Sequence, residues 1–421
     1  MGLILDSEVI LTAEKPVVGG RMLARHEGQV IFVAGAIPGE RVRARVERVG
    51  RQLAYAETLE VLDPSPDRRS SDVDRACGGS HYAHIAYRRQ LSLKSALVVD
   101  AFARIAKITI AGEVPIAASQ EQGFRMRARL HARNGRFGFF REGTHELCDP
   151  GATQQLLPET LAVFDRLRSA LGAKEVERVL SCELSENIPA DERTVLLEMD
   201  QGSSCSLHVE AIDGLTGLAF VDHDNVRPRV AYGSPYVTDR VEITGNAMTL
   251  TRHVQSFFQG NRYLLPGLAG RVLELVPDGD VTDLYAGVGL FAVALAASGR
   301  TGIVAVEGDR PSARDLETNA APYAGAIAIE YMPVEGYLQR HGIGRTRTVV
   351  VDPPRTGISR EAVSSLIGLK PSRVVYVSCD PATVARDVKR FVEGGYRLAH
   401  IEALDLFPNT AHVETVVVLE R

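Results

Sequence analysis

The feature that most constrains the fold of this 421-residue chain is a regular alternation of short apolar runs and helical patterns beyond residue 252. The runs are rich in β-branched residues, as buried strands are, and apolar residues recur at helical spacing between most of them. Strand candidates are residues 281–284, 302–306, 348–351, 374–378 and 415–419, with helix candidates at 290–297 and 313–321. This rhythm predicts an α/β domain with a doubly wound parallel sheet, which binds ligands beyond the carboxyl ends of its strands.

A glycine-rich turn, Asp283-Leu-Tyr-Ala-Gly-Val-Gly289, follows the first of these strands. Its glycines let the backbone turn tightly and approach a ligand closely. Glu307 ends the next strand about 20 residues later, where a carboxylate can accept hydrogen bonds from both ribose hydroxyls of an adenosine. Because Ala292 breaks the pattern G-x-G-x-x-G, a cofactor without a pyrophosphate, such as S-adenosylmethionine, fits better than NAD. The alternative is an ordinary βα turn with a surface acid.

Chemically active residues also follow the later strands. Asp352-Pro-Pro-Arg355 predicts a stiff loop with two polar groups, because consecutive prolines hold the backbone extended. Cys379 follows the strand at 374–378. A free cysteine is usually a small buried apolar residue. A cysteine at a strand end between polar neighbours, however, can act as a nucleophile. Glu414 precedes the last strand, and it is either a surface acid or a general base opposite Cys379.

The N-terminal half differs in pattern. Residues 1–63 read as all-β, and the period-2 alternation at 41–46 places Arg41, Arg43 and Arg45 on one face. That face is either solvated or belongs to an OB-like barrel that presents cations to phosphates. Residues 124–141 hold six arginines and no acid, with Phe137, Phe139 and Phe140 interleaved, a composition that suits RNA but also the wet face of a strand.

Composition narrows the class of protein. No apolar run reaches the ~20 residues that span a bilayer, and the first residues lack the order of a signal peptide, so we expect a cytoplasmic protein without membrane contact. The five scattered cysteines argue against a disulfide framework. Cys77 and Cys148 supply only two of the four ligands that an iron–sulfur cluster or a structural zinc needs. We therefore expect no metal and interpret both cysteines as structural.

Together the motifs resemble those of the bacterial RNA uridine-5-methyltransferases, which make 5-methyluridine in 23S ribosomal RNA or transfer RNA. Residues 1–63 look like the TRAM domain of that family, an RNA-binding barrel, and Phe257-Phe-Gln-Gly-Asn261 is similar to its FFQxN motif. The matching motifs imply cofactor-binding roles for four residues, Gln259, Tyr285, Glu307 and Asp352. They also imply that Cys379 is the nucleophile and Glu414 the base.

The resemblance further implies three domains: a barrel at residues 1–63, a central RNA-binding domain at 64–245 and a Rossmann-like methyltransferase domain at 246–421. In that family the helix near residues 91–115 packs on the last of these. Members with an iron–sulfur cluster carry a C-x5-C-x2-C run, in which Ser71 and Ser80 replace two cysteines here. We expect a monomer that acts on RNA.

The implied reaction is methylation of uridine C5 by S-adenosylmethionine, through a covalent bond between Cys379 and C6 of the base. The TRAM-like barrel favours ribosomal RNA, and the absence of a cysteine from residues 352–355 favours uracil over cytosine. Other hypotheses are a transfer RNA enzyme, an NAD-type oxidoreductase and an inactive RNA-binding homologue. The last is disfavoured by the joint presence of Cys379 and Glu414.

Overall fold

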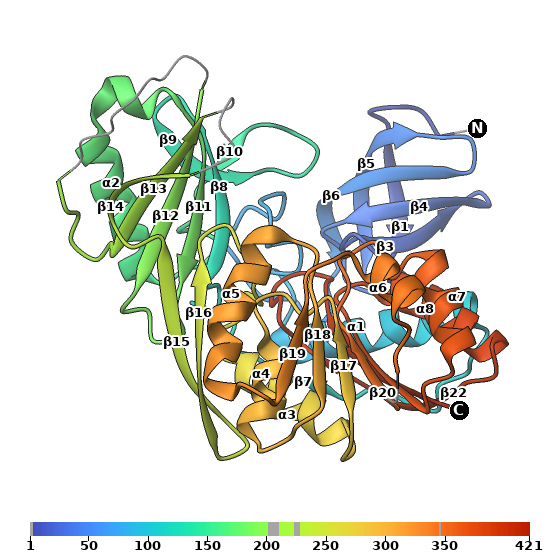
Figure 1. Ribbon diagram of the computed structural model, residues 1–421. Coiled ribbons are helices and arrows are strands. Elements are labelled where there is room, and N and C mark those ends of the chain that lie inside the picture. Colours follow the sequence, from blue (N-terminus) through green and yellow to red (C-terminus); the bar gives the residue numbers. More distant parts are fainter. Residues whose placement is uncertain (1–2, 201–209, 223–227, 345–346) are drawn as a thin grey trace.

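The computed structural model describes residues 3–200, 210–222, 228–344 and 347–421. The N-terminal strands (blue) and a central sheet (green) form separate layers above a larger α/β unit (yellow to red) (Figure 1). The predicted fold class is confirmed: a mixed α/β unit carries an N-terminal all-β sheet and a central α+β region. No helix in the described residues is long and apolar enough to cross a membrane.

The N-terminal sheet has the strand order β1-β5-β6-β4-β3-β2. Its strands are β1 (Glu8–Thr12), β2 (Lys15–Pro16), β3 (Met22–His26), β4 (Gln29–Ala34), β5 (Arg41–Val49) and β6 (Leu53–Asp63). The alternation along β5 buries Val42, Ala44 and Val46 and exposes Arg41, Arg43 and Arg45, as predicted. Each arginine, however, has a carboxylate partner: Arg41 with Asp63, Arg43 with Glu60 and Glu8, and Arg45 with Glu57. This face is therefore a ladder of exposed ion pairs rather than a free cationic surface.

The chain then enters the C-terminal unit before it builds the central sheet. Helix α1 (Tyr87–Ala101) continues into a π-helical turn, η1 (Phe102–Ala106), and packs against α8 (Pro381–Glu393). Phe102 lies in the same apolar core as Val384 and Val388. Lys94 and Asp405 form an ion pair between fully buried side chains. An early helix thus completes the C-terminal core.

The central sheet has the order β10-β9-β8-β11-β12-β13-β14 and is covered on one face by α2 (Pro158–Val176). Its strands are β8 (Arg127–Arg133), β9 (Arg136–Phe140), β10 (Leu147–Cys148), β11 (Val179–Glu186), β12 (Arg193–Met199), β13 (Gly217–Asp222) and β14 (Arg229–Gly233). Leu130 and Leu184 of the sheet pack with Phe164 and Leu167 of α2. The stretch 195–241, whose sequence carries no catalytic or binding motif, lies partly outside the described residues.

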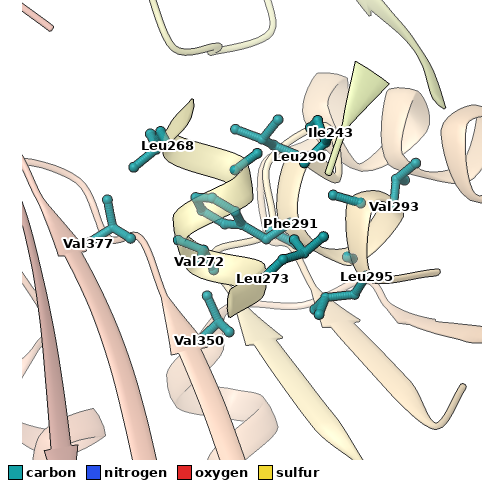
Figure 2. Close-up of a cluster of buried hydrophobic side chains, with 14 of the residues drawn as sticks. Ile243, Leu268, Val272, Leu273, Leu290, Phe291, Val293, Leu295, Val350 and Val377 are labelled. Carbon is teal, nitrogen blue, oxygen red and sulfur yellow. The ribbon is translucent and has the colours of Figure 1, made fainter. Parts of the chain in front are cut away.

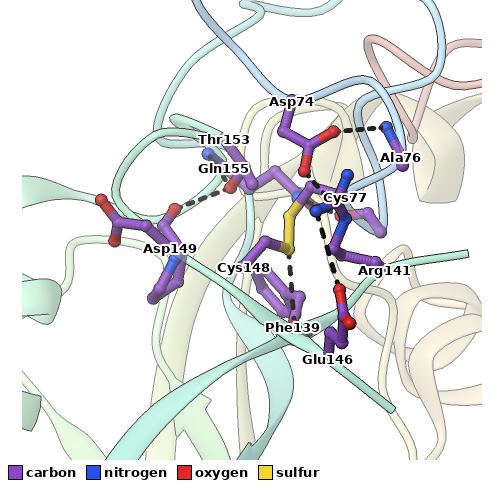
Figure 3. Close-up of a disulfide and its surroundings, with 12 residues drawn as sticks. Asp74, Ala76, Cys77, Phe139, Arg141, Glu146, Cys148, Asp149, Thr153 and Gln155 are labelled. Atoms are coloured by element: carbon purple, nitrogen blue, oxygen red, sulfur yellow. Dashed lines mark hydrogen bonds and ion pairs between the residues drawn. A yellow bond between two sulfur atoms is a disulfide. The ribbon is translucent and has the colours of Figure 1, made fainter. Parts of the chain in front are cut away.

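One disulfide joins Cys77 to Cys148, with 5.8 Å between the two Cα atoms (Figure 3). The scattered cysteines had argued against disulfides, and for this pair that expectation is wrong. The residues are 71 positions apart, and only the folded chain brings them together, where β10 pairs with β9 and Cys77 bridges to Arg141. The bond ties the segment after the N-terminal sheet to the edge of the central sheet.

The C-terminal sheet has the order β19-β18-β17-β20-β21-β23-β22-β7. Its strands are β7 (Ile116–Ala117), β17 (Val281–Leu284), β18 (Ile303–Val306), β19 (Ile327–Glu330), β20 (Thr348–Val351), β21 (Arg373–Ser378), β22 (Arg397–Leu404) and β23 (Glu414–Glu420). The sheet is parallel from β19 to β21, but β23 runs antiparallel to both β21 and β22. The expectation of a wholly parallel sheet is therefore wrong at this end, because the last strand inserts as a hairpin partner of β22.

Helices cover both faces of this sheet. They are α3 (Leu265–Leu275), α4 (Leu290–Ala297), α5 (Arg310–Ala320), η2 (Ala321–Tyr323), α6 (Val334–Arg340), α7 (Arg360–Leu369) and α8. Figure 2 shows one of the two cores, in which Phe291 and Leu295 of α4 and Val272 of α3 gather over Val350 of β20. A two-stranded ribbon, β15 (Tyr236–Ile243) and β16 (Asn246–His253), leads from the central sheet to α3 and packs on α4 and α5.

Candidate active site

The topology gathers the predicted site residues at one edge of the C-terminal sheet. Strands β17, β18, β20 and β21 are parallel, so the loops that follow them leave from the same edge. Those loops carry Tyr285, Glu307, Asp352 and Cys379. Glu414 begins β23, and because β23 is antiparallel to β21, with Ser378 paired to Thr415, its first residue lies beside the end of β21. The antiparallel insertion is what brings Glu414 to Cys379.

The turn after β17 has the positive φ angles that its glycines permit, and Tyr285 shares this conformation although it is not a glycine. Tyr285 has a φ of 62° and Gly289 a φ of 98°, and a Cβ atom on Gly289 would lie only 2.7 Å from Leu316. The backbone N–H of Gly287 donates a hydrogen bond to Glu307 Oε2 at 2.7 Å. Glu307 therefore lies against the glycine turn, with the second carboxylate oxygen bound to the N–H of Asp309.

Two carboxylates, Asp283 and Asp352, lie at this edge of the C-terminal sheet. Gln259 Nε2 donates a hydrogen bond to Asp352 Oδ2 at 3.0 Å, and burial raises the pKa of Asp352 to about 7. Asp283 is fully buried; one of its oxygens accepts from Ala292 N–H, and the other has no partner in the described structure. Burial, with the charges of Asp352 and Glu307, holds the pKa of Asp283 well above its usual range. An acceptor-rich site with an unpaired buried oxygen suits a cationic ligand that brings N–H and O–H donors.

Cys379 and Glu414 form the second half of the site. Cys379 is a free, half-buried thiol, whereas Glu414 is buried. Burial, followed by the charge of Glu414, raises the pKa of Cys379 to about 11, and a hydrogen bond and the charge of Arg355 act in the opposite direction. Burial and Asp352 raise the pKa of Glu414 well above its usual range, again opposed by Arg355. Arg355 is thus the cation that stabilises both ionised groups.

The structure adds residues to this edge that the sequence had not placed there. Arg125 forms a β-bridge with Asn261, so the arginine-rich stretch runs beside the loop that carries Gln259. Burial and the neighbouring Arg355 lower the pKa of Arg125 to about 10. The guanidinium of Arg127 lies 5.8 Å from the ring centroid of Phe257, whose side chain is 61% exposed. Both motifs are visible in the sequence, but their pairing depends on a contact that spans more than a hundred positions.

An iron–sulfur cluster does not fit the residues present. The two cysteines available at the family's cluster positions are bonded to each other, and the other two positions hold Ser71 and Ser80. Among the described residues, no three histidine, cysteine, aspartate or glutamate side chains are arranged to hold a metal ion.

Comparison with known proteins identifies the family and the fold. The family profile described as tRNA (Uracil-5-)-methyltransferase matches residues 223–421, and the TRAM domain profile matches residues 7–59. An uncharacterised RNA methyltransferase of Streptomyces coelicolor is 33% identical over 96% of this chain and 90% of its own length. A 23S rRNA (uracil(1939)-C(5))-methyltransferase of Aeromonas hydrophila is 29% identical over 95% and 93%.

Among solved structures, a Pyrococcus abyssi tRNA (uracil-54, C5)-methyltransferase in complex with S-adenosyl-L-homocysteine has a TM-score of 0.77. It is 24% identical and covers 97% of this chain and 99% of its own, so it shares the whole fold. The resemblance inferred from the motifs is confirmed by these matches. The chain belongs to the RNA (uracil-5-)-methyltransferase family and carries that family's N-terminal TRAM domain.

Proposed function

We propose that the protein methylates C5 of a uridine in ribosomal RNA, with S-adenosylmethionine as the methyl donor. The observation that carries this proposal is the placement of a half-buried free thiol, Cys379, beside a buried carboxylate, Glu414, and a guanidinium, Arg355, at the ligand edge of the sheet. The choice of ribosomal RNA follows curated relatives that match almost the whole chain.

The acceptor-rich half of the site fits S-adenosylmethionine. The cofactor would be held by Gln259, Tyr285, Glu307 and Asp352. The carboxylates of Glu307 and Asp352 can accept hydrogen bonds from its ribose hydroxyls and its amino group. Asp283 adds a buried oxygen that lacks a donor in the described structure. When bound, this cofactor supplies a methyl group on a positively charged sulfur, which is an electrophile for a carbon nucleophile.

The Cys379 thiol turns C5 of the target uracil into a nucleophile. C5 of uracil is a weak nucleophile, and addition of the Cys379 thiolate to C6 places the electron pair of the C5–C6 double bond on C5. Arg355 favours the thiolate, because its charge and hydrogen bond lower the pKa that burial raises. The target base must leave its stack to reach this edge, where the exposed Phe257 ring offers a stacking surface.

Glu414 completes the reaction as a base. After C5 has gained the methyl group it still carries its proton; the Glu414 carboxylate takes that proton, the C5–C6 double bond reforms and the bond from C6 to Cys379 breaks. Burial makes the ionised Glu414 a stronger base than an exposed glutamate, because its pKa is raised. Sulfur leaves as the thiolate that Arg355 stabilises.

The test is methyl transfer from labelled S-adenosylmethionine to unmodified 23S rRNA and, separately, to unmodified tRNA transcripts. We expect incorporation into 23S rRNA and none by the Cys379→Ala variant, which should still bind the cofactor. The Glu414→Gln variant should accumulate a covalent RNA–protein adduct on a denaturing gel, because elimination needs the base. Transfer to tRNA alone would contradict the choice of substrate, and normal transfer by Cys379→Ala would contradict the nucleophile.

A further inference from the structure

In the described part of the chain, no helix packs on the second face of the central sheet, and β8 lines that face with polar side chains. Helix α2 covers the face on which Leu130 of β8 is buried. On the other face lie Arg127, Arg129, His131 and Arg133, which alternate with the buried positions along the strand. Side chains two residues apart on one face of a strand are separated by about 6.6 Å, so the four form a row about 20 Å long.

An aromatic stack stands at the outer end of this row. The His131 and Phe140 rings are parallel, with centroids 3.7 Å apart and an interplanar angle of 9°. The His145 ring is roughly perpendicular to Phe140, with centroids 5.4 Å apart, and the Arg133 guanidinium lies 5.7 Å from the Phe140 centroid. His131 and Phe140 are half-buried and His145 is exposed, so the stack lies at the surface rather than in the core. Burial and the neighbouring Arg129 lower the pKa of His131, which favours the neutral, more readily stacked imidazole.

Charge on this face is positive on balance. Arg127 pairs with Glu183, and Arg129 pairs with Glu183 and Glu198. Arg133 and Arg136, exposed at the two ends of the β8–β9 turn, have no carboxylate within 4.0 Å in the described part of the chain. Four arginines thus face two glutamates, and two guanidinium charges are left for an external anion.

The row leads into the candidate active site. Its inner end is Arg127, whose guanidinium lies over Phe257, next to the loop of Gln259. A strand of nucleic acid whose target base occupies that site can therefore continue along β8 without crossing another element of the central sheet. Neighbouring aromatic surfaces and free guanidinium groups are what single-stranded RNA needs, because its bases expose flat faces and its phosphates carry charge.

We propose that His131, Phe140, Arg133 and Arg136, here called the β8–β9 platform, bind single-stranded RNA beside the target nucleotide. Bases stack on the His131–Phe140 pair, and phosphates contact Arg133 and Arg136. The inference rests on the proposed function, because it takes RNA as the substrate, and it adds a binding site for the RNA that flanks the target base.

The test measures RNA binding apart from catalysis. Fluorescence anisotropy with a labelled oligouridylate should show that Phe140→Ala weakens affinity by about tenfold, since one base–aromatic stack contributes about 1–3 kcal/mol and 1.4 kcal/mol is tenfold. His131→Phe should preserve affinity, because the stack survives, whereas His131→Ala should weaken it. The Arg133→Ala/Arg136→Ala variant should lower the slope of log affinity against log salt by about 1.4, or about 0.7 per lost phosphate contact.

A matched control removes two cations from the opposite face of the same domain. Arg168 and Lys174 are exposed on α2, and their double alanine variant should leave affinity and salt slope unchanged. Unchanged oligouridylate binding in Phe140→Ala and Arg133→Ala/Arg136→Ala, with folding verified by circular dichroism, would overturn the platform. Binding that depends on the platform, without methyl transfer to any RNA by the unaltered protein, would support the platform and refute the proposed function.

Discussion

The electrostatics of Cys379 lead to a prediction with opposite signs for two neighbouring substitutions. Arg355 lowers the pKa of the thiol, whereas Glu414 raises it, and the balance with burial is a pKa of about 11. Replacing Arg355 with methionine should raise that pKa further. Replacing Glu414 with glutamine should lower it. A nearby charge shifts a pKa by about 1–3 units, so we take one unit for each change.

The size of the effect on reactivity follows from the thiolate population. At pH 8, about one Cys379 in a thousand is ionised, because the pH lies three units below the pKa. A one-unit decrease in the pKa raises that fraction tenfold, but each thiolate becomes about threefold less nucleophilic, so alkylation should accelerate about threefold. By the same reasoning Arg355→Met should slow it about threefold. The acceleration by Glu414→Gln should shrink at acidic pH, where Glu414 is already neutral because its pKa is raised.

The assay is the rate of iodoacetamide alkylation of the free protein, read from the Cys379 peptide by mass spectrometry across a pH series. Reading the peptide separates Cys379 from the buried Cys182 and from other thiols. Arg360→Met, at the exposed start of α7, is the matched control and should change nothing. The reasoning is refuted if the two site variants shift the rate in the same direction, or if Arg355→Met leaves it unchanged.

Three further predictions follow from contacts described above. Because Asp352 has a pKa of about 7 and must be ionised to attract a cation, affinity for S-adenosylmethionine, measured by calorimetry, should fall as the pH drops below 7, and Asp352→Asn should be weak and nearly pH-independent. Reduction of the disulfide, or its removal by Cys77→Ser/Cys148→Ser, should lower stability in a urea titration by about 4 kcal/mol on the chain-entropy estimate for a separation of 71 residues. Arg43→Ala should change oligouridylate affinity less than Glu60→Gln does, and Glu60→Gln should increase it, since that variant leaves Arg43 with only the more distant of its two carboxylate partners, Glu8; equal loss in both would contradict the ion-pair ladder.

The parts of the fold that the sequence predicted well are those with a local signal. Strand β20 has the bounds expected from its apolar run, because strands buried on both faces are almost continuously apolar. Strand β17 also has the expected bounds, although Thr282 and Asp283 in it are polar. Strand β22 was missed, since its sequence mixes polar and apolar residues and half of it is only partly buried. The place of β23 between β21 and β22 could not be read from the chain, because strand order is set by pairing between distant segments.

The same distinction applies to the site. Loops that follow parallel strands share an edge by geometry, so Glu307, Asp352 and Cys379 could be grouped from the sequence alone. The approach of Arg127 to Phe257 depends on how the central sheet docks on the C-terminal unit, for which the sequence carries no local sign. The partners of Arg43 are likewise cross-strand neighbours in a sheet whose register was unknown.

Electrostatic interactions couple the acceptor-rich half of the candidate active site to the half that holds Cys379 and Glu414. Asp283, Asp352 and Glu414 all have raised pKa values, so the site holds acids whose ionisation is opposed by burial and by one another. A bound cation relieves that opposition, and by linkage it must also stabilise the folded chain, more strongly as the pH rises and the carboxylates ionise. The same cation would add to Arg355 in lowering the pKa of Cys379, since both oppose the carboxylates that raise it. A thiol with a pKa of about 11 is nearly inert at neutral pH, so this arrangement would make the proposed nucleophile reactive mainly when a positively charged ligand is already in place.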